Sequence, residues 1–307
     1  MAKKSGKSSG LKIGIVGGAI AGSTAAIELT RAGHDVTVFE RTIGQLKGRG
    51  AGISTPVSML NGLIERDLLD ADFPHFTVAE MPLIGRSAAD DRLGHTAWTL
   101  PVSLAALNWV DLYRNLRKRV PDQVYHQGIN VVGAGMYNAD TAELQLDDGN
   151  VMGFDLVIFA DGAQSFGRRL LCPDAEIEYR GYVLWRGVLD EKDLDDTGPL
   201  ESSMPRLSYK GLSGHLVLYF VPGRDGSTAK GERLVNWEAY IPVHAEELPS
   251  FLTDRQGRQR PGAIPPRAMR PEEETRLKKV MGDHLPSYYA GIINASQNTF
   301  AQAIYTI

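Results

Sequence analysis

The sequence predicts a chain of the α/β class (α+β overall), in which a parallel sheet with helices is joined to a second, mostly antiparallel sheet. Two observations predict this division. Residues 12–41 have the pattern of a strand, a glycine-rich turn, a helix and another strand, which is the order of a parallel βαβ unit. After residue 178, short apolar stretches alternate with polar residues between turns rich in glycine and proline, which is typical of antiparallel strands.

The first pattern indicates a dinucleotide-binding unit of the Rossmann type. Ile13–Val16 is an apolar run expected of a strand buried on both faces, and Ser23–Ala32 has helical composition. The turn between them consists of Gly17, Gly18, Ala19, Ile20, Ala21 and Gly22. Gly17 permits a sharp turn, a small residue at 19 lets the backbone approach a pyrophosphate, and Gly22 lets the helix pack closely on the strand. The pyrophosphate would meet the helix N-terminus, where free N–H groups favour an anion.

An acidic residue follows the second strand of this unit at the position expected for a ribose contact. The strand is predicted over Asp35–Phe39, and Glu40 stands roughly 20 positions after Gly17. The pattern departs from the usual glycine fingerprint at Ala19, which adds one methyl group. An ordinary glycine-rich β–α turn is the alternative interpretation, but it does not explain why strand, helix and acid are all in register.

The next stretches supply further turns and a series of mixed elements. Three glycines within residues 48–52 imply that this backbone lies close to a bulky group. A second acidic turn, Asp161-Gly162, follows an apolar strand, and open α/β sheets bind ligands at the carboxyl ends of such strands. A simple Asp-Gly turn is the alternative. Helices are predicted over 59–69, 105–120 and 272–284, and strands over 77–86, 96–100, 125–137, 141–146, 151–159, 179–189, 206–209, 215–221, 234–243 and 300–307.

Composition excludes several classes of function. The 307 residues are 43% hydrophobic and 23% charged, with a net charge of −4, so no broad affinity for nucleic acid or an anionic membrane is expected. No apolar run has the length of a membrane span, and residues 1–10 read as a disordered tail without the apolar core of a signal peptide. The single Cys172 cannot form an internal disulfide, which predicts a cytoplasmic protein. Because HExxH and CxxC motifs are missing from the sequence, no metal site is predicted, and because GxSxG is missing, no serine nucleophile of that type is predicted.

Together these motifs resemble the FAD-dependent aromatic hydroxylases, flavoprotein monooxygenases with the para-hydroxybenzoate hydroxylase fold. Three motifs carry the resemblance, which covers nearly the whole chain from Leu11: the glycine turn with Glu40-Arg41, the Arg49–Ile53 loop, and Asp161-Gly162 with Ser165 and Arg168. Tyr113 stands where many members have an arginine that touches the flavin. The resemblance therefore implies that the glycine turn is joined in cofactor binding by Glu40, Arg41, Arg49, Gly50, Gly52, Ile53, Tyr113, Asp161 and Gly162. For Arg49 a surface cation is the alternative.

The resemblance also implies how the chain is divided. It assigns residues 11–75 and 101–178 to an FAD-binding domain, 76–100 and 179–299 to a substrate domain, and 300–307 to the start of a return strand to the FAD domain. Members of the family have a Gly-Asp motif that holds the ribityl chain of the flavin. It would be expected within tens of residues after Ile307, and the sequence given has no matching motif, so we expect either a fragment or a cleaved chain.

The activity implied is hydroxylation of a small hydroxylated aromatic or pyridine-type ring. FAD would be reduced by NADH or NADPH and would react with O2 to give a flavin C4a-hydroperoxide. Substrate contacts are predicted from His215 and Tyr219 on one strand and Trp185 on another, with His215 as an orienting group or base whose pKa suits neutral pH. The alternatives are that His215 simply begins a strand and that Tyr219 and Trp185 pack within the sheet.

Other functions stay open at this point. Another flavin oxidase or dehydrogenase of the same fold would share the motifs, and the missing Gly-Asp segment makes a truncated, non-catalytic nucleotide-binding protein a third hypothesis. A plain NAD dehydrogenase explains neither the 48–53 loop nor Asp161-Gly162. The partners expected are a small aromatic substrate and O2, with no nucleic acid and no membrane, and a homodimer is left open.

Overall fold

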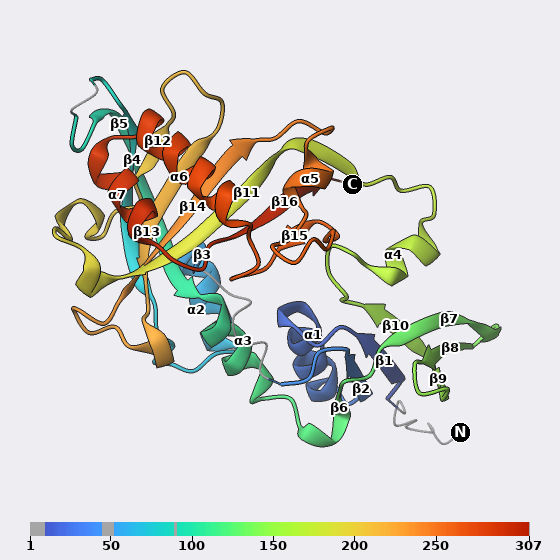
Figure 1. Ribbon diagram of the computed structural model, residues 1–307. Coiled ribbons are helices and arrows are strands. Elements are labelled where there is room, and N and C mark those ends of the chain that lie inside the picture. The colour runs from blue at the N-terminus through green and yellow to red at the C-terminus, as the bar shows by residue number, and fades with distance from the viewer. Residues whose placement is uncertain (1–9, 45–51, 89–90, 307) are drawn as a thin grey trace. The chain divides into compact units, whose positions relative to one another are not determined.

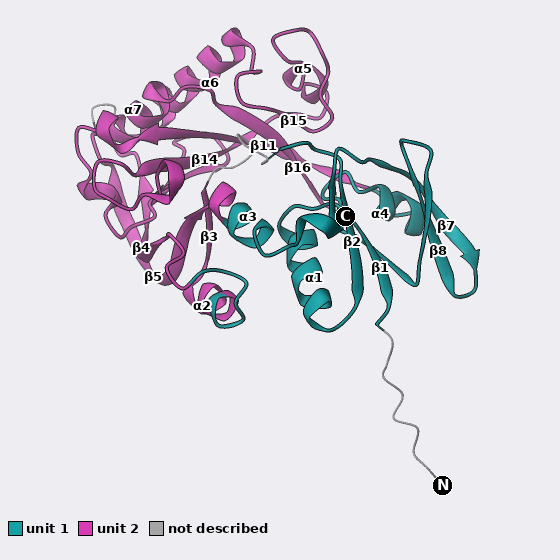
Figure 2. Cartoon of the chain, turned by 90° about the horizontal axis from the view of Figure 1, so that it is seen from below, with its two compact units in different colours: residues 1–47, 64–70, 112–176 teal, residues 48–63, 71–111, 177–307 magenta. Residues whose placement is uncertain are grey.

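The computed structural model describes residues 10–44, 52–88 and 91–306. The chain forms two compact units that alternate along the sequence (Figure 2). The first comprises residues 1–47, 64–70 and 112–176, and the second comprises 48–63, 71–111 and 177–307. The functional domain boundaries expected from the sequence stay a prediction.

The first unit is built on a parallel sheet with the strand order β10-β1-β2-β6 (Figure 1). Its strands are β1 (Lys12–Val16), β2 (Asp35–Glu40), β6 (Tyr125–Gln127) and β10 (Leu156–Phe159), and helix α1 (Ile20–Arg31) connects β1 to β2. The predicted strand-turn-helix-strand unit is therefore present. The helix begins three residues before the predicted start because the last part of the glycine turn already forms its first turn.

A second, antiparallel sheet completes the first unit. It consists of β7 (Val131–Asn138), β8 (Thr141–Leu146) and β9 (Val151–Phe154). Leu144, Leu146 and Phe154 pack against Val16 and Phe39 of the parallel sheet. The unit also contains the short helix α4 (Phe166–Leu171).

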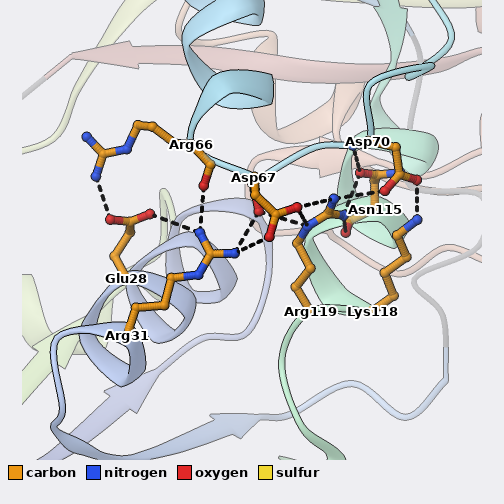
Figure 3. Close-up of polar contacts among 8 residues, drawn as sticks. All are labelled: Glu28, Arg31, Arg66, Asp67, Asp70, Asn115, Lys118 and Arg119. Carbon is orange, nitrogen blue, oxygen red and sulfur yellow. Dashed lines mark hydrogen bonds and ion pairs between the residues drawn. The ribbon is translucent and has the colours of Figure 1, made fainter.

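An ion-pair network links three segments of the first unit (Figure 3). Arg119 contacts Asp67 at 3.0 Å and Asp70 at 2.8 Å, and Arg31 on α1 contacts Asp67 at 2.7 Å. Asp70 also pairs with Lys118. The network therefore holds α1, the 66–70 segment and the 115–119 segment to one another.

The second unit is built on a nine-stranded sheet with the order β15-β16-β11-β14-β13-β12-β4-β5-β3. The strands are β3 (Gly52–Pro56), β4 (Phe76–Gly85), β5 (His95–Asn108), β11 (Glu178–Asp190), β12 (Arg206–Ser208), β13 (His215–Val221), β14 (Leu234–Pro242), β15 (Ala263–Ile264) and β16 (Phe300–Thr306). All neighbours pair antiparallel except β12 and β4, which are parallel. The predicted combination of a Rossmann-like unit and a mostly antiparallel sheet is confirmed.

Helices cover one face of this large sheet. They are α6 (Pro271–His284) and α7 (Ser287–Ala295), with the short α5 (Leu248–Phe251) nearby (Figure 1). Leu277 and Met281 from α6 and Ile293 from α7 belong to one buried core with Trp185 and Trp237 of the sheet. Helix α7 has no counterpart among the predicted elements.

Two predicted helices have different bounds. The helix expected over 105–120 is wrong in its first part, because β5 runs to Asn108 and only α3 (Trp109–Arg117) is helical. Ala105 and Ala106 pair with β3 and β4 on either side, and this pairing overrides their helical propensity. The helix expected over 59–69 is α2 (Val57–Glu65), which ends before the network of Figure 3. None of the helices that the structure describes is long and apolar enough to cross a membrane.

Candidate cofactor and substrate sites

Each of three positions in the turn after β1 has room only for glycine. Gly17 has a φ of +96°, and a methyl group there would lie 2.4 Å from the carbonyl oxygen of Ala160. A methyl group on Gly18 would lie 2.2 Å from the Tyr125 hydroxyl, and one on Gly22 would lie 1.8 Å from the carbonyl oxygen of Gly17. Backbone and helix therefore approach each other as closely as a dinucleotide-binding turn requires.

Buried hydroxyl groups form hydrogen bonds to the backbone of this turn. The Tyr125 and Ser23 hydroxyls each donate to the carbonyl oxygen of Gly18, both at 2.8 Å. The Tyr113 hydroxyl lies 3.3 Å from that of Tyr125, and Tyr113 is buried. Burial raises the pKa of Tyr125, so its hydroxyl keeps the proton that it donates. Tyr113, predicted to contact the cofactor, therefore reaches the glycine turn through Tyr125.

The carboxylate of Glu40 is fixed across the turn. It accepts hydrogen bonds from the backbone N–H of Gly18 at 2.9 Å and of Thr42 at 2.8 Å, and the residue is only 6% exposed. No side-chain hydrogen bond caps the N-terminus of α1 at Ala19, so its first N–H groups are suited to bind an anion. The neighbouring Arg41 is exposed. These groups fit the pyrophosphate and a ribose of a dinucleotide.

Asp161 lies beside Gly17, at the end of β10. One of its oxygens, Oδ2, accepts from the N–H groups of Phe166 at 2.6 Å and Gly167 at 3.3 Å at the start of α4. The other oxygen, Oδ1, is buried and has no hydrogen-bond partner within the described ranges. Gly162 has a φ of +79°. The sequence did not reveal the capping role, but the unpartnered oxygen beside the glycine turn fits a nucleotide that donates a hydrogen bond.

The two faces of the nine-stranded sheet separate the predicted substrate residues. Cross-strand neighbours share a face, and His215 pairs with Tyr240 while Tyr219 pairs with Asn236. Trp185 pairs with Ala239, which lies on the opposite face of β14 from Asn236 and Tyr240. Trp185 is fully buried in the core that includes residues of α6 and α7. The prediction that Trp185 joins His215 and Tyr219 at one site is therefore wrong. We call the side that carries His215 and Tyr219 the open face, although Tyr219 itself is only 2% exposed and belongs to a buried cluster with Val78 and Val221.

A hydrogen-bonded cluster that the sequence did not reveal lies on the open face. Glu238 accepts from the Tyr219 hydroxyl at 3.0 Å and from Arg186 at 2.6 Å. Arg186 also donates to the carbonyl oxygen of Gly52 at 2.6 Å, and the Gly52 N–H donates to Asn236 at 2.7 Å. Gly52 is thus held by side chains on both sides. The neighbouring Ile53 is half-buried in β3, while Arg49 and Gly50 lie outside the described residues.

His215 is less basic than the sequence suggests. Its ring stacks on Tyr240 at 4.4 Å with an interplanar angle of 17°. Burial, helped by the positive charge of Arg206, lowers the pKa of His215 to about 4. The prediction of a pKa suited to neutral pH is corrected accordingly: the imidazole is neutral at pH 7 and can accept a hydrogen bond. Burial likewise raises the pKa of Tyr219 well above its usual value.

His215 lines two hollows of the second unit. One, of about 540 Å³, is lined by Tyr182, Tyr240, Arg180 and Arg206 among others. The second, of about 430 Å³, shares His215 and Arg206 and extends over β4 and β5. Both have the size of a small-molecule site. Across the described residues no three side chains of His, Cys, Asp or Glu are grouped to hold a metal ion.

The glycine turn and the fixed acid define a nucleotide-binding unit of the Rossmann-like α/β class. Family models agree: an NAD(P)-binding Rossmann-like domain matches residues 15–48, and an FAD binding domain-like family matches residues 179–306. The predicted cofactors, FAD with NADH or NADPH, are consistent with both models.

Among individual proteins, the chain is similar in sequence to monooxygenases that act on aromatic rings. The chain is 30% identical over 264 residues to 2,6-dihydroxypyridine 3-monooxygenase of Paenarthrobacter nicotinovorans, covering 85% of this chain and 63% of the relative. It is 30% identical over 248 residues to 3-amino-4-hydroxybenzoate 2-monooxygenase of Streptomyces cremeus, covering 78% and 58%. The chain thus spans less than two thirds of the length of these relatives.

Solved structures of monooxygenases and hydroxylases also match the fold of this chain. The structure of 2,6-dihydroxypyridine-3-hydroxylase from Arthrobacter nicotinovorans matches with a TM-score of 0.83 at 25% identity, covering 96% of this chain and 72% of that one. A salicylate hydroxylase substrate complex matches in fold, with a TM-score of 0.70 at 17% identity over 97% and 69% of the two chains. The predicted resemblance to FAD-dependent aromatic hydroxylases of the para-hydroxybenzoate hydroxylase fold is confirmed.

Proposed function

We propose that this chain is the FAD- and substrate-binding part of a monooxygenase that hydroxylates a small hydroxylated aromatic or pyridine-type ring. The observation that carries the proposal is the turn after β1, where Gly17, Gly18 and Gly22 leave no room for a side chain and Glu40 accepts a hydrogen bond from the N–H of Gly18. The sequence relatives supply the reaction class.

The cofactor would be held by groups of the first unit. The N-terminus of α1 would bind the pyrophosphate, Glu40 a ribose, and the free oxygen of Asp161 a further hydroxyl. Bound FAD would supply the activation of O2. The use of NADH or NADPH and the hydroperoxide route belong to the same proposal, as do the contacts from Arg41, Arg49, Gly50 and Tyr113.

The substrate ring would lie on the open face of the second unit. Neutral His215 would accept a hydrogen bond from a ring hydroxyl and so increase the electron density of the ring, which favours attack on an electrophilic oxygen. Tyr219 donates its proton to Glu238, which leaves its oxygen as an acceptor for a second polar group. Trp185 has no place in this proposal.

The test uses the purified protein reconstituted with FAD. We expect a flavin absorption spectrum, NADH or NADPH oxidation that 2,6-dihydroxypyridine stimulates, and one atom from 18O2 in the product. Substrate-dependent NAD(P)H oxidation without oxygen in the product would replace the proposal by an oxidase or dehydrogenase. Failure to retain FAD would favour the non-catalytic nucleotide-binding hypothesis for this chain.

The proposal extends to the setting of the enzyme. We place it in the cytoplasm, which the single Cys172 supports, with a small aromatic compound and O2 as its partners and without nucleic acid or membrane. A homodimer is tested by light scattering of the purified protein.

A further inference from the structure

The larger hollow on the open face has flat aromatic walls. The rings of His215 and Tyr240 are stacked, and the Tyr182 ring lies 6.0 Å from that of Tyr240 with a 53° tilt. All three lie on the same side of the sheet, since His215 pairs with Tyr240 and Tyr182 pairs with Pro242, two positions further along β14. Such walls suit a planar ring, which gains contact area by offset stacking.

The charge of this hollow is positive. Its charged lining residues are Arg180 and Arg206, and none of the described residues that line it is a carboxylate. Arg180 is already paired with Glu178 at 2.7 Å. Within the part of the chain that the structure describes, Arg206 has neither an ion pair nor a side-chain hydrogen bond, although it borders both hollows. A guanidinium is permanently charged and can form two parallel hydrogen bonds to an anionic group.

Other charges on the open face do not neutralise Arg206. Glu238 is bound by Arg186 and Tyr219. His215 carries no charge at neutral pH, and the positive charge of Arg206 contributes to that state. The hollow therefore combines a neutral imidazole, stacked aromatic rings and one uncommitted cation.

We propose that Arg206 determines substrate specificity by pairing with an anionic oxygen, carboxylate or ionised hydroxyl, on a planar aromatic ring that lies against Tyr240 and His215. This inference rests on the proposed function and adds to it the charge of the substrate and the residue that selects it. The uncommitted guanidinium at the edge of both hollows is the observation that carries it.

The experiment measures binding by calorimetry on the FAD-reconstituted protein with two matched probe pairs. The carboxylate arm compares 6-hydroxynicotinate with neutral 6-hydroxynicotinamide, and the hydroxyl arm compares 2,6-dihydroxypyridine with 2,6-dimethoxypyridine. We expect the protein to prefer the anionic probe in at least one arm. Arg206→Gln should lower the affinity for that probe by about 10- to 100-fold, because a charge-assisted bidentate contact is lost. The affinity for the neutral partner probe should stay unchanged.

Two further variants complete the design. Arg206→Lys keeps the charge but loses the planar fork, so it should bind the anion with intermediate affinity. Arg180→Gln removes a cation that is already paired, so it should change the affinity for the anion less than threefold. Equal binding of charged and neutral probes, or equal losses for both in Arg206→Gln, would refute the inference. If the protein hydroxylates the ring but shows no preference for charged probes, the inference about Arg206 is refuted and the proposed function stands. If it prefers charged probes but inserts no oxygen, only the proposed function is refuted.

Discussion

Gly17 combines a left-handed backbone conformation with a close contact to Ala160, so a side chain there meets two obstacles. We predict that Gly17→Ala weakens FAD binding by about 10- to 100-fold, because relieving 1 to 3 kcal/mol of local strain must move the turn. The measurement is titration of the apoprotein with FAD by flavin fluorescence, together with thermal unfolding.

Gly149 provides a matched control for this change. Its φ of +88° is similar, but no atom lies within 4 Å of the position where a methyl group would stand. Gly149→Ala should lower the free energy of unfolding by about 1 to 2 kcal/mol through the backbone alone and leave FAD binding intact. If both variants bind FAD equally well, the glycine turn does not hold the cofactor.

His215 provides a prediction about protonation. Because burial and the charge of Arg206 hold its pKa at about 4 instead of 6.5, the imidazole should stay neutral from pH 8 down to pH 5, and the folded protein should take up its proton only near pH 4. NMR titration of the ring nitrogens measures this midpoint. Arg206→Gln should raise the midpoint, since one opposing charge is removed. A midpoint near 6.5 in the unmodified protein would show that the ring is solvated.

At this scale the sequence predicted some residues and misplaced others for clear reasons. The tight glycine turn and the position of Glu40 beside it were predictable because they depend on a short, continuous segment; their part in cofactor binding stays a prediction. Trp185 was misplaced because the face that a strand residue occupies depends on its pairing partner, Ala239 on β14. The role of Glu238 likewise depends on Arg186 and Tyr219, which lie on two other strands.

Among the elements, the network of Figure 3 gives a pH-dependent prediction. Hydrogen bonds from Lys118 first, and then from Asn115 and Arg119, lower the pKa of Asp70 from 3.8 to about 2. A carboxylate with a lowered pKa stabilises the fold above its unfolded pKa, and the contribution is lost as the pH falls through the folded value. Asp70→Asn should therefore cost about 1 kcal/mol at pH 7, allowing for solvent screening, and less as the pH falls from about 4 to about 2.

Urea unfolding at pH 7 and pH 3 measures this difference. Asp72→Asn is the control, because Asp72 is exposed and makes no ion pair within the described ranges. It should change the stability by less than about 0.5 kcal/mol at both pH values. An Asp70→Asn penalty that is the same at pH 3 as at pH 7 would contradict the ionic origin of the effect.

The elements also show where local propensity fails. Alanine and leucine at 105–107 favour a helix, yet these residues continue β5 because β3 and β4 flank them on both sides. Strand β13, which Gly214 and Pro222 flank, was predictable to the residue. The sequence patterns therefore identify elements bounded by turns more reliably than a junction where a strand passes directly into a helix.

For the molecule as a whole, we expect Arg233, in a buried ion cluster of the second unit, to have a large effect on the free energy of unfolding. Arg233 contacts Glu191 at 2.5 Å and Glu201 at 2.6 Å, and its guanidinium lies 3.9 Å from the centre of the Phe220 ring. Glu191 is only 3% exposed. Arg233→Met would leave that carboxylate without its cation, so we predict a loss of about 3 to 5 kcal/mol in the free energy of unfolding.

Chemical denaturation followed by circular dichroism measures this loss. Arg224→Gln serves as the control, because Arg224 pairs with Asp190 at 3.3 Å on the surface and 79% of its side chain is exposed. That variant should lose less than about 0.5 kcal/mol. Similar losses in the two variants would mean that burial does not decide the strength of these pairs. The partners of Arg233 could not be predicted, since they come from segments about 30 to 40 positions apart.

The distribution of tryptophan between the two units has an optical consequence. Trp98, Trp109, Trp185 and Trp237 all fall within the ranges of the second unit, and Trp185 and Trp237 meet edge to face at 4.9 Å in its core. The first unit, which carries the glycine turn, contains only tyrosine and phenylalanine as fluorescent side chains. It could lose its fold with no direct change in indole emission. A denaturation curve recorded by that emission alone would therefore report the stability of the second unit and give no direct signal from the first.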